Sequence, residues 1–193
     1  SNVQFARTYF DVYDARMANV MPTDGYVSLC QCRLCEGKSA PERGYRGLLS
    51  DYVWGYANEV AKEVYKTHPH KLVSCGSYTA FQQPPRNVDQ LSPNMVVRIK
   101  RNRMRGYDPQ TRQEALDLRK AWMEKLSGEK PIRMGDNYSA PGKEGLPIYF
   151  PHLIAEDMQS LKGICESEYI EVNAVSDYDS QPPIKLAVNH LNI

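Results

Sequence analysis

The segment Met95–Lys100 (MVVRIK) decides the fold class, because it begins a pattern of strand, helix and strand. Its apolar and β-branched residues predict a buried strand. Asp108 and Pro109 then supply an N-cap and a first-turn proline for a helix. Pro131–Tyr138 predicts the next strand. The apolar residues between them recur at helical spacing and define a buried face: Ala115, Leu118, Trp122 and Leu126.

The same alternation continues on both sides of this unit. Strands are predicted at residues 17–21, 71–78 and 164–170, and helices at residues 5–13, 50–67 and 151–161. Strands separated by helices imply parallel pairing with right-handed crossovers. No strand is followed by a glycine-rich nucleotide-binding loop, so we expect no cofactor. The long loops all follow strands. This favours an α/β fold of the partial (β/α)8 TIM-barrel type, with about five of eight strands present.

The domain organisation follows from the two ends of the sequence. The chain has no initiator Met, it opens inside a helical pattern and it stops at Ile193 inside another. We therefore expect residues 1–193 to be a single segment of a catalytic-type barrel domain, truncated at both ends. Its expected partner is the remainder of the same barrel.

The composition excludes several classes of protein. With 41% apolar and 24% charged residues, the 193-residue chain has the composition of an ordinary globular domain. The net charge of +1 provides no field that would attract nucleic acid, and no apolar run is long enough for membrane insertion. The aromatic residues are mainly Tyr, 13 against 4 Phe and 2 Trp, which suits polar-lined clefts such as carbohydrate sites.

Carboxylates near predicted strand ends are the candidate catalytic groups. Asp136 ends one strand, and Glu166 and Glu168 lie on the next, where strand periodicity places both glutamates on one face. Neighbouring parallel strands lie about 4.8 Å apart, so Asp136 and Glu166 are predicted to form an acid/base pair. Such a pair is what glycoside hydrolysis requires. Asp24, in a Pro-Thr-Asp-Gly turn, is a third catalytic candidate, although turn chemistry also explains it.

Other residues fit substrate binding. Tyr78 and Tyr138 follow predicted strands and suit stacking on sugar rings. Arg98 begins a basic cluster that fits a sugar carboxylate or another anion, and a solvated charged face is the alternative interpretation. Glu168 is included as a substrate-binding candidate.

Cys30, Cys32 and Cys35 form a Cys-x-Cys-x-x-Cys group in a polar excursion between residues 25 and 47. They fit a metal knuckle, a disulfide-stapled loop or reduced packing residues. No second cysteine pair follows at zinc-finger spacing, so the expectation is no metal. Zinc held by these three residues and Cys75 is the weaker alternative.

Several segments together resemble the bacterial family named domain of unknown function 4838. They are residues 21–25 (MPTDG), 30–35 (CQCRLC), 49–54 (LSDYVW), 91–94 (LSPN) and 161–167 (LKGICES). The resemblance implies part of a (β/α)8 domain similar to glycoside hydrolases, with α-glucuronidases as distant relatives. It assigns Glu166, Asp136 and Asp24 to the acids of the family pattern. It also implies an extracellular or periplasmic location, which would favour a disulfide in the cysteine loop.

These observations lead to three hypotheses. The first is a glycoside hydrolase-like domain that acts on poly- or oligosaccharide by carboxylate acid/base catalysis. The second is a non-catalytic carbohydrate-binding barrel that uses the same cleft. The third is an interaction module in which zinc supports the cysteine loop.

Overall fold

The computed structural model describes residues 1–102, 108–127, 131–137 and 151–170. Within them lies one five-stranded sheet, ordered β1-β2-β3-β4-β5 with every neighbouring pair parallel. The bounds of the strands are β1 Met17–Asn19, β2 Leu72–Ser77, β3 Met95–Asn102, β4 Ile132–Asn137 and β5 Cys165–Ile170. The predicted strands are all present.

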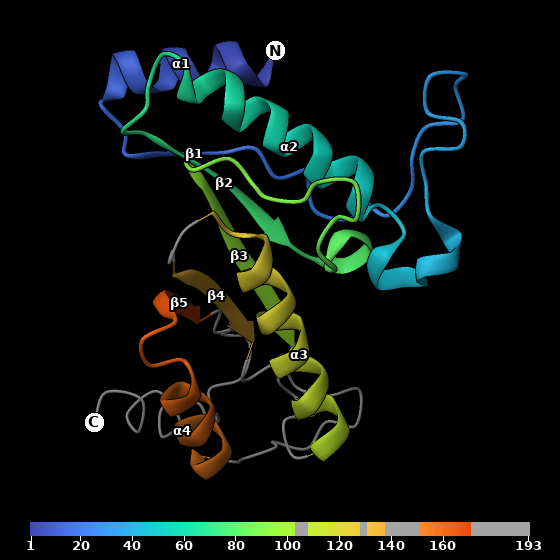
Figure 1. The fold of residues 1–193 in the computed structure, drawn as a ribbon, viewed down its shortest axis with the longest axis vertical. Helices are drawn as coiled ribbons and strands as arrows, with labels where there is room; N and C mark the ends of the chain where they lie inside the picture. Colours follow the sequence, from blue (N-terminus) through green and yellow to red (C-terminus); the bar gives the residue numbers. More distant parts are fainter. Residues whose placement is uncertain (103–107, 128–130, 138–150, 171–193) are drawn as a thin grey trace, which may run out of the picture.

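Four helices alternate with these strands, as Figure 1 shows. Their bounds are α1 Asn2–Tyr13, α2 Ser50–Tyr65, α3 Pro109–Lys125 and α4 Pro151–Ser160. Short 3-10 turns lie at η1 Pro41–Arg43, η2 Tyr45–Gly47 and η3 Thr79–Phe81. Because the strand order along the sheet repeats the order along the chain, the arrangement is consistent with a partial β/α barrel and differs from a doubly wound sheet. The predicted fold class is confirmed.

The helix boundaries follow from local capping. The Asp108 carboxylate accepts the amide N–H of Thr111 at 2.9 Å, and Pro109 occupies the first turn of α3, as predicted. Helix α2 begins at Ser50, so Ser50 is the first residue of the helix and does not cap it. Its N-cap is Leu49, whose amide N–H donates to the carbonyl oxygen of Ala80.

The core lies between the helices and one face of the sheet. In register, Cys75 pairs with Val97 and Ile99 pairs with Met134, and all four side chains are buried. Trp54 of α2 and Trp122 of α3 meet inside this core with ring centroids 4.3 Å apart. Both indoles are fully buried. They therefore join two consecutive helices beneath the end of β2.

The segment 91–94 (LSPN) takes part in a buried network of polar side chains. The Ser92 amide N–H donates to Asn58 Oδ1 at 2.7 Å, and the Ser92 hydroxyl donates to Asn94 Oδ1 at 2.7 Å. Asn94 Nδ2 in turn donates to the carbonyl oxygen of Ala61 at 3.0 Å. Buried polar groups satisfied in this way fix one geometry. The segment therefore ties the start of β3 to α2 and has a structural role.

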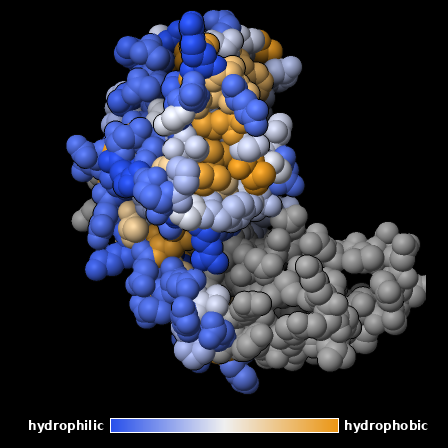
Figure 2. Space-filling model, turned by 90° about the vertical axis from the view of Figure 1, so that its right-hand side faces the viewer, coloured by the Kyte–Doolittle hydropathy of each residue, from blue (hydrophilic) through white to orange (hydrophobic). Residues whose placement is uncertain are grey.

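One face of the molecule carries a continuous apolar area framed by hydrophilic residues (Figure 2). Contiguous apolar areas are typical of interaction surfaces. The partner expected from the sequence, the remainder of a barrel, stays a prediction. Within the described ranges, no helix combines the length and the apolar character of a membrane span.

Candidate functional site

A pocket of roughly 630 Å³ lies over the carboxyl ends of the first four strands. Asn19 reaches it from the end of β1, Tyr78 from the residue after β2, Lys100 from β3 and Gly135 from β4. The first turns of α3 and the excursion after β1 form its other walls. The remaining lining residues are Met21, Pro22, Asp24, Tyr45, Arg46, Thr79, Gln82, Thr111, Glu114, Ala115 and Leu118. Enzymes on parallel α/β scaffolds collect their reactive groups at this edge.

The floor of the pocket is shaped by a glycine. A Cβ atom on Gly135 would lie 2.8 Å from Lys100 Cδ and 3.1 Å from its Cε, so the Lys100 side chain crosses the sheet where Gly135 has no side chain. The Lys100 ammonium then lies 5.0 Å from the centroid of the Tyr169 ring. This is a cation–π distance. A positive charge is thereby held at the edge of the pocket.

The wall formed by Thr79 is strained. Thr79 has a φ of 41°, a left-handed conformation that a β-branched residue rarely adopts. Its hydroxyl is buried and has no hydrogen-bond partner among the described residues. Backbone strain and an unsatisfied buried hydroxyl each cost free energy and cluster at functional sites. Thr79, two residues after the end of β2, combines backbone strain with an unsatisfied buried hydroxyl.

Two carboxylates line the pocket within the described residues. Asp24 is exposed, and its Oδ1 accepts the amide N–H of Gly25 at 2.9 Å in a tight turn. Glu114 projects from the second turn of α3 and pairs with Arg46 at 3.2 Å across the pocket wall. The pocket therefore offers carboxylates from two separate segments, together with the aromatic rings of Tyr45 and Tyr78.

An ion-pair cluster around Asp51 positions the wall that carries Tyr45 and Arg46. The Asp51 carboxylate accepts Arg43 Nη1 at 2.9 Å and the backbone N–H of Arg86 at 2.6 Å. Arg86 also reaches Glu42 at 2.6 Å, and this hydrogen bond lowers the pKa of the Glu42 carboxyl. Burial lowers the pKa of Arg43 and outweighs the opposite effect of the Asp51 charge. These contacts give Asp51 a structural role at the start of α2, because they fasten η1 and η2 to the rest of the site.

The structure corrects the expected placement of Glu166. It is the second residue of β5, so it lies near the amino end of the strand and away from the pocket. Its carboxylate accepts Arg133 Nε at 2.9 Å and lies 3.5 Å from Arg16. The hydrogen bond from Arg133 lowers the pKa of Glu166. The signal was available in the sequence, because the predicted strand 164–170 already places Glu166 near its amino end.

Glu166 is also far from its expected partner. In register, Asp136 lies opposite Ile170, four residues beyond Glu166 along β5. At about 3.3 Å per residue, this corresponds to roughly 13 Å, longer than the separation that glycosidases use. The structure does not bring Asp136 and Glu166 together as an acid/base pair. Asp136 itself follows Gly135 at the carboxyl end of β4, and its side chain lies outside the described part of the chain.

The expectation that Glu166 and Glu168 share a face is wrong. The pairing shifts between Ile132 and Arg133, so that Ser167 pairs with Arg133 and Glu168 with Met134. This irregularity makes Glu166 an extra residue in the strand, as in a β-bulge. As a result, Glu168 lies on the face of the sheet that the helices cover. The expected substrate-binding position of Glu168 at the strand mouth is therefore not observed.

The other predicted substrate-binding residues fall in three places. Tyr78 lines the pocket. Arg98 lies deeper in the sheet, two residues before Lys100, paired in register with Gly76 and Arg133. Tyr138 lies outside the described residues.

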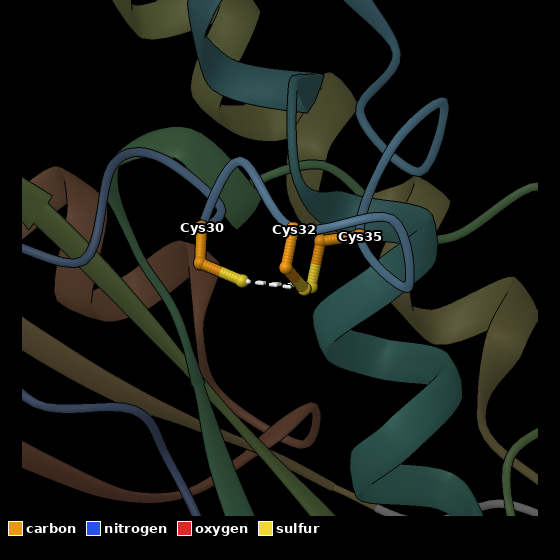
Figure 3. Close-up of side chains that lie close together, drawn as sticks. All are labelled: Cys30, Cys32 and Cys35. Carbon is orange, nitrogen blue, oxygen red and sulfur yellow. Dashed lines mark hydrogen bonds between the residues drawn. The ribbon is translucent and has the colours of Figure 1, made fainter.

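None of the five cysteines forms a disulfide, so the disulfide implied by the resemblance is not present. Cys30, Cys32 and Cys35 converge in the excursion after β1 (Figure 3). Hydrogen bonding to Cys30 lowers the pKa of Cys32 to about 7 and raises that of Cys35 to about 11. Cys75 lies elsewhere, on β2, where burial raises the pKa of its thiol to about 12. Cys75 is therefore not part of the cysteine group, and the alternative in which four cysteines hold zinc is wrong for this residue.

Sequence reasoning missed Glu114 and Thr79. Glu114 stands among polar residues on the exposed side of α3 and is indistinguishable there from a solvated charge. The available signal was positional, because the first turns of a helix that follows a strand lie beside the same sheet edge. Thr79 gave no signal, since backbone strain is not encoded in residue type.

Comparison with known proteins gave one match. A family model described as domain of unknown function (DUF4838) matches residues 7–128. Neither a curated protein nor a solved structure shows significant similarity to the chain. The matched range contains most of the pocket lining and the whole cysteine excursion.

Proposed function

This chain belongs to the DUF4838 family, and on that premise we propose that it is a glycoside hydrolase-like domain acting on poly- or oligosaccharide. The observation that carries the proposal is the pocket at the carboxyl ends of β1 to β4, lined by Asp24, Glu114 and two tyrosines. Carboxylates and aromatic rings in one pocket are what sugar hydrolysis requires. The distant relation to α-glucuronidases and a location outside the cytoplasm are parts of the same proposal.

The proposed mechanism uses carboxylates from separate segments. Asp24, exposed at the pocket wall, donates a proton to the leaving glycosidic oxygen as general acid. Asp136 lies one residue before the end of β4 and is the proposed second carboxylate. Because it alternates with the pocket residue Gly135, it would reach the pocket over the carboxyl edge of the sheet, where it activates water or attacks the anomeric carbon. Glu114, held by Arg46, accepts hydrogen bonds from sugar hydroxyls. Tyr45 and Tyr78 stack on the ring faces.

The test is an activity assay of the chain within its full-length protein, on aryl glycosides and on uronic-acid oligosaccharides. Asp24→Asn and Asp136→Asn should each lower kcat about 100-fold or more, because each removes a proton-transfer or nucleophilic group. Glu114→Gln should mainly raise KM. Glu166→Gln is the matched control, because Glu166 lies at the other end of the sheet, and it should retain activity. Unchanged turnover in both aspartate variants would overturn the mechanism.

A non-catalytic carbohydrate-binding domain is the second candidate. It is favoured by the fact that Glu114 is already ion-paired and that Asp24 is engaged in a turn. Calorimetric binding of an oligosaccharide without product after prolonged incubation would select this candidate. Loss of that binding in a Tyr78→Ala variant would locate it in the pocket.

A further inference from the structure

The excursion after β1 has little of the packing that normally orders a loop, because Met21, Tyr26 and Leu29 are only partly buried where they pack against the core. From residue 21 to residue 39, not one residue is buried. Its four internal backbone hydrogen bonds are all local and connect residues at most four apart, such as Cys35 N–H to the carbonyl oxygen of Cys32 at 2.9 Å. A segment of this length with only partial apolar burial gains little to offset the conformational entropy lost on ordering. A further interaction would stabilise it.

Three sulfur atoms meet in the middle of this segment. Cys30 Sγ lies 3.0 Å from Cys32 Sγ and 3.3 Å from Cys35 Sγ, and the ligand atoms of all three lie within 4.8 Å of one another. In Figure 3 the three side chains point toward one another from one short stretch of loop. A tetrahedral Zn²⁺ with Zn–S bonds of about 2.3 Å holds its sulfurs about 3.8 Å apart. The sulfurs would therefore need to separate by less than about 1 Å.

A side-chain donor from the core lies beside the three-cysteine group. The Tyr52 side chain, at the start of α2, hydrogen-bonds Cys35. Donors of this kind orient thiolate ligands around a metal and distribute their charge. They also link the three-cysteine group to a helix of the core.

A disulfide would use only two of these three sulfurs. A bond between Cys30 and Cys32 spans a single intervening residue, and any choice of pair leaves the third thiol beside it. A soft metal ion engages all three at once, and sets of thiolates select Zn²⁺ among common divalent ions.

We propose that Cys30, Cys32 and Cys35 bind one Zn²⁺ ion through three thiolates, with the fourth coordination position facing solvent. The exposure of Cys30 and Cys32 places that position on the outer side of the loop. The ion fixes the path of the chain between Asp24, upstream, and Arg46, downstream, both of which line the pocket. Its role is to order a pocket wall, independent of which reaction the pocket performs.

The test begins with metal content. The protein, purified without chelator and desalted, should contain about one zinc per chain by elemental analysis. Cys32→Ser should reduce this at least tenfold. Cys165→Ser is the matched control, because Cys165 is a half-buried cysteine on β5 outside the three-cysteine group, and it should leave the zinc content unchanged. Circular dichroism checks that each variant is folded.

A second measurement uses the wild-type protein and does not depend on a variant that folds. After removal of zinc by a chelator, added Co²⁺ should give thiolate-to-cobalt charge-transfer absorption, and added Zn²⁺ should abolish it and protect three thiols from alkylation. The proposal is overturned if the folded protein binds neither ion. It is equally overturned if the intact mass of the native protein shows that two of the three cysteines form a disulfide. Neither readout uses catalysis, so the result is separate from the fate of the proposed function.

Discussion

The side chain of Lys100 lies across the Cα of Gly135, at a point where an added methyl group would come 2.8 Å from Lys100 Cδ. The two residues are partners in register on β3 and β4. The absence of a side chain on one strand thus determines the path of a charged side chain from its neighbour.

Gly135→Ala should displace Lys100 with little effect on stability. The clash is with a flexible side chain, so we expect the free energy of unfolding to fall by less than about 1 kcal/mol. The ammonium should leave the ring of Tyr169, and ligand binding in the pocket should weaken several-fold. Urea denaturation and calorimetric titration measure the two effects. Equal stability with unchanged ligand affinity would contradict this role of Gly135.

Thr79→Gly should stabilise the protein. Glycine tolerates the left-handed conformation at φ 41°, which costs other residues about 1–2 kcal/mol, and the unsatisfied hydroxyl is removed as well. After the greater entropy of glycine in the unfolded chain is subtracted, we expect a gain of about 0.5–1 kcal/mol. Thr79→Val keeps the strain and removes the hydroxyl alone, so the pair separates the two contributions. A destabilised Thr79→Gly variant in urea denaturation would refute the argument.

Trp122→Phe should destabilise the fold by about 2–3 kcal/mol. The Trp122 indole N–H donates to the Ser77 hydroxyl at 3.1 Å and to the carbonyl oxygen of Gln82 at 3.0 Å, so its loss loosens the turn that bears Thr79. Chemical denaturation followed by circular dichroism measures the change. Tyr56→Phe, at an exposed aromatic position on α2, should change stability by less than about 0.5 kcal/mol.

The ion pair between Arg133 and Glu166 should stabilise the fold only while the Glu166 carboxylate is ionised. Hydrogen bonding to Arg133 lowers the pKa of Glu166 below its usual value of 4.5, so its contribution is complete above 4.5 and is lost as the pH falls through the lowered pKa. Because the Glu166 side chain is 35% exposed, we expect less than about 1 kcal/mol.

Urea denaturation of the wild type and of Glu166→Gln, repeated from neutral to acidic pH, tests the direction of this pH dependence. The stability difference between the two proteins should be largest near neutral pH and should shrink as the solution becomes acidic. A difference that stays constant down to strongly acidic pH would show that the charge of Glu166 has no part in it.

The sequence predicted the elements well because local patterns specify them. The Asp108–Pro109 start of α3 and the strand around Val97 depend on capping and apolar alternation, and both were confirmed. The candidate site was harder to predict, because it depends on register. One extra residue at Glu166 moves its neighbours between faces of the sheet, and no local signal distinguishes a bulged strand from a regular one.

The strand order of this sheet has a consequence for how the chain folds. Each strand pairs with the one that precedes it in the sequence, from β1 through β5. A nascent chain leaving the ribosome therefore adds each new strand and helix to an edge that is already formed. Each new pairing closes only one crossover, which keeps the entropic cost of each step below that of joining strands remote in the sequence and favours assembly during synthesis, from the amino terminus onward.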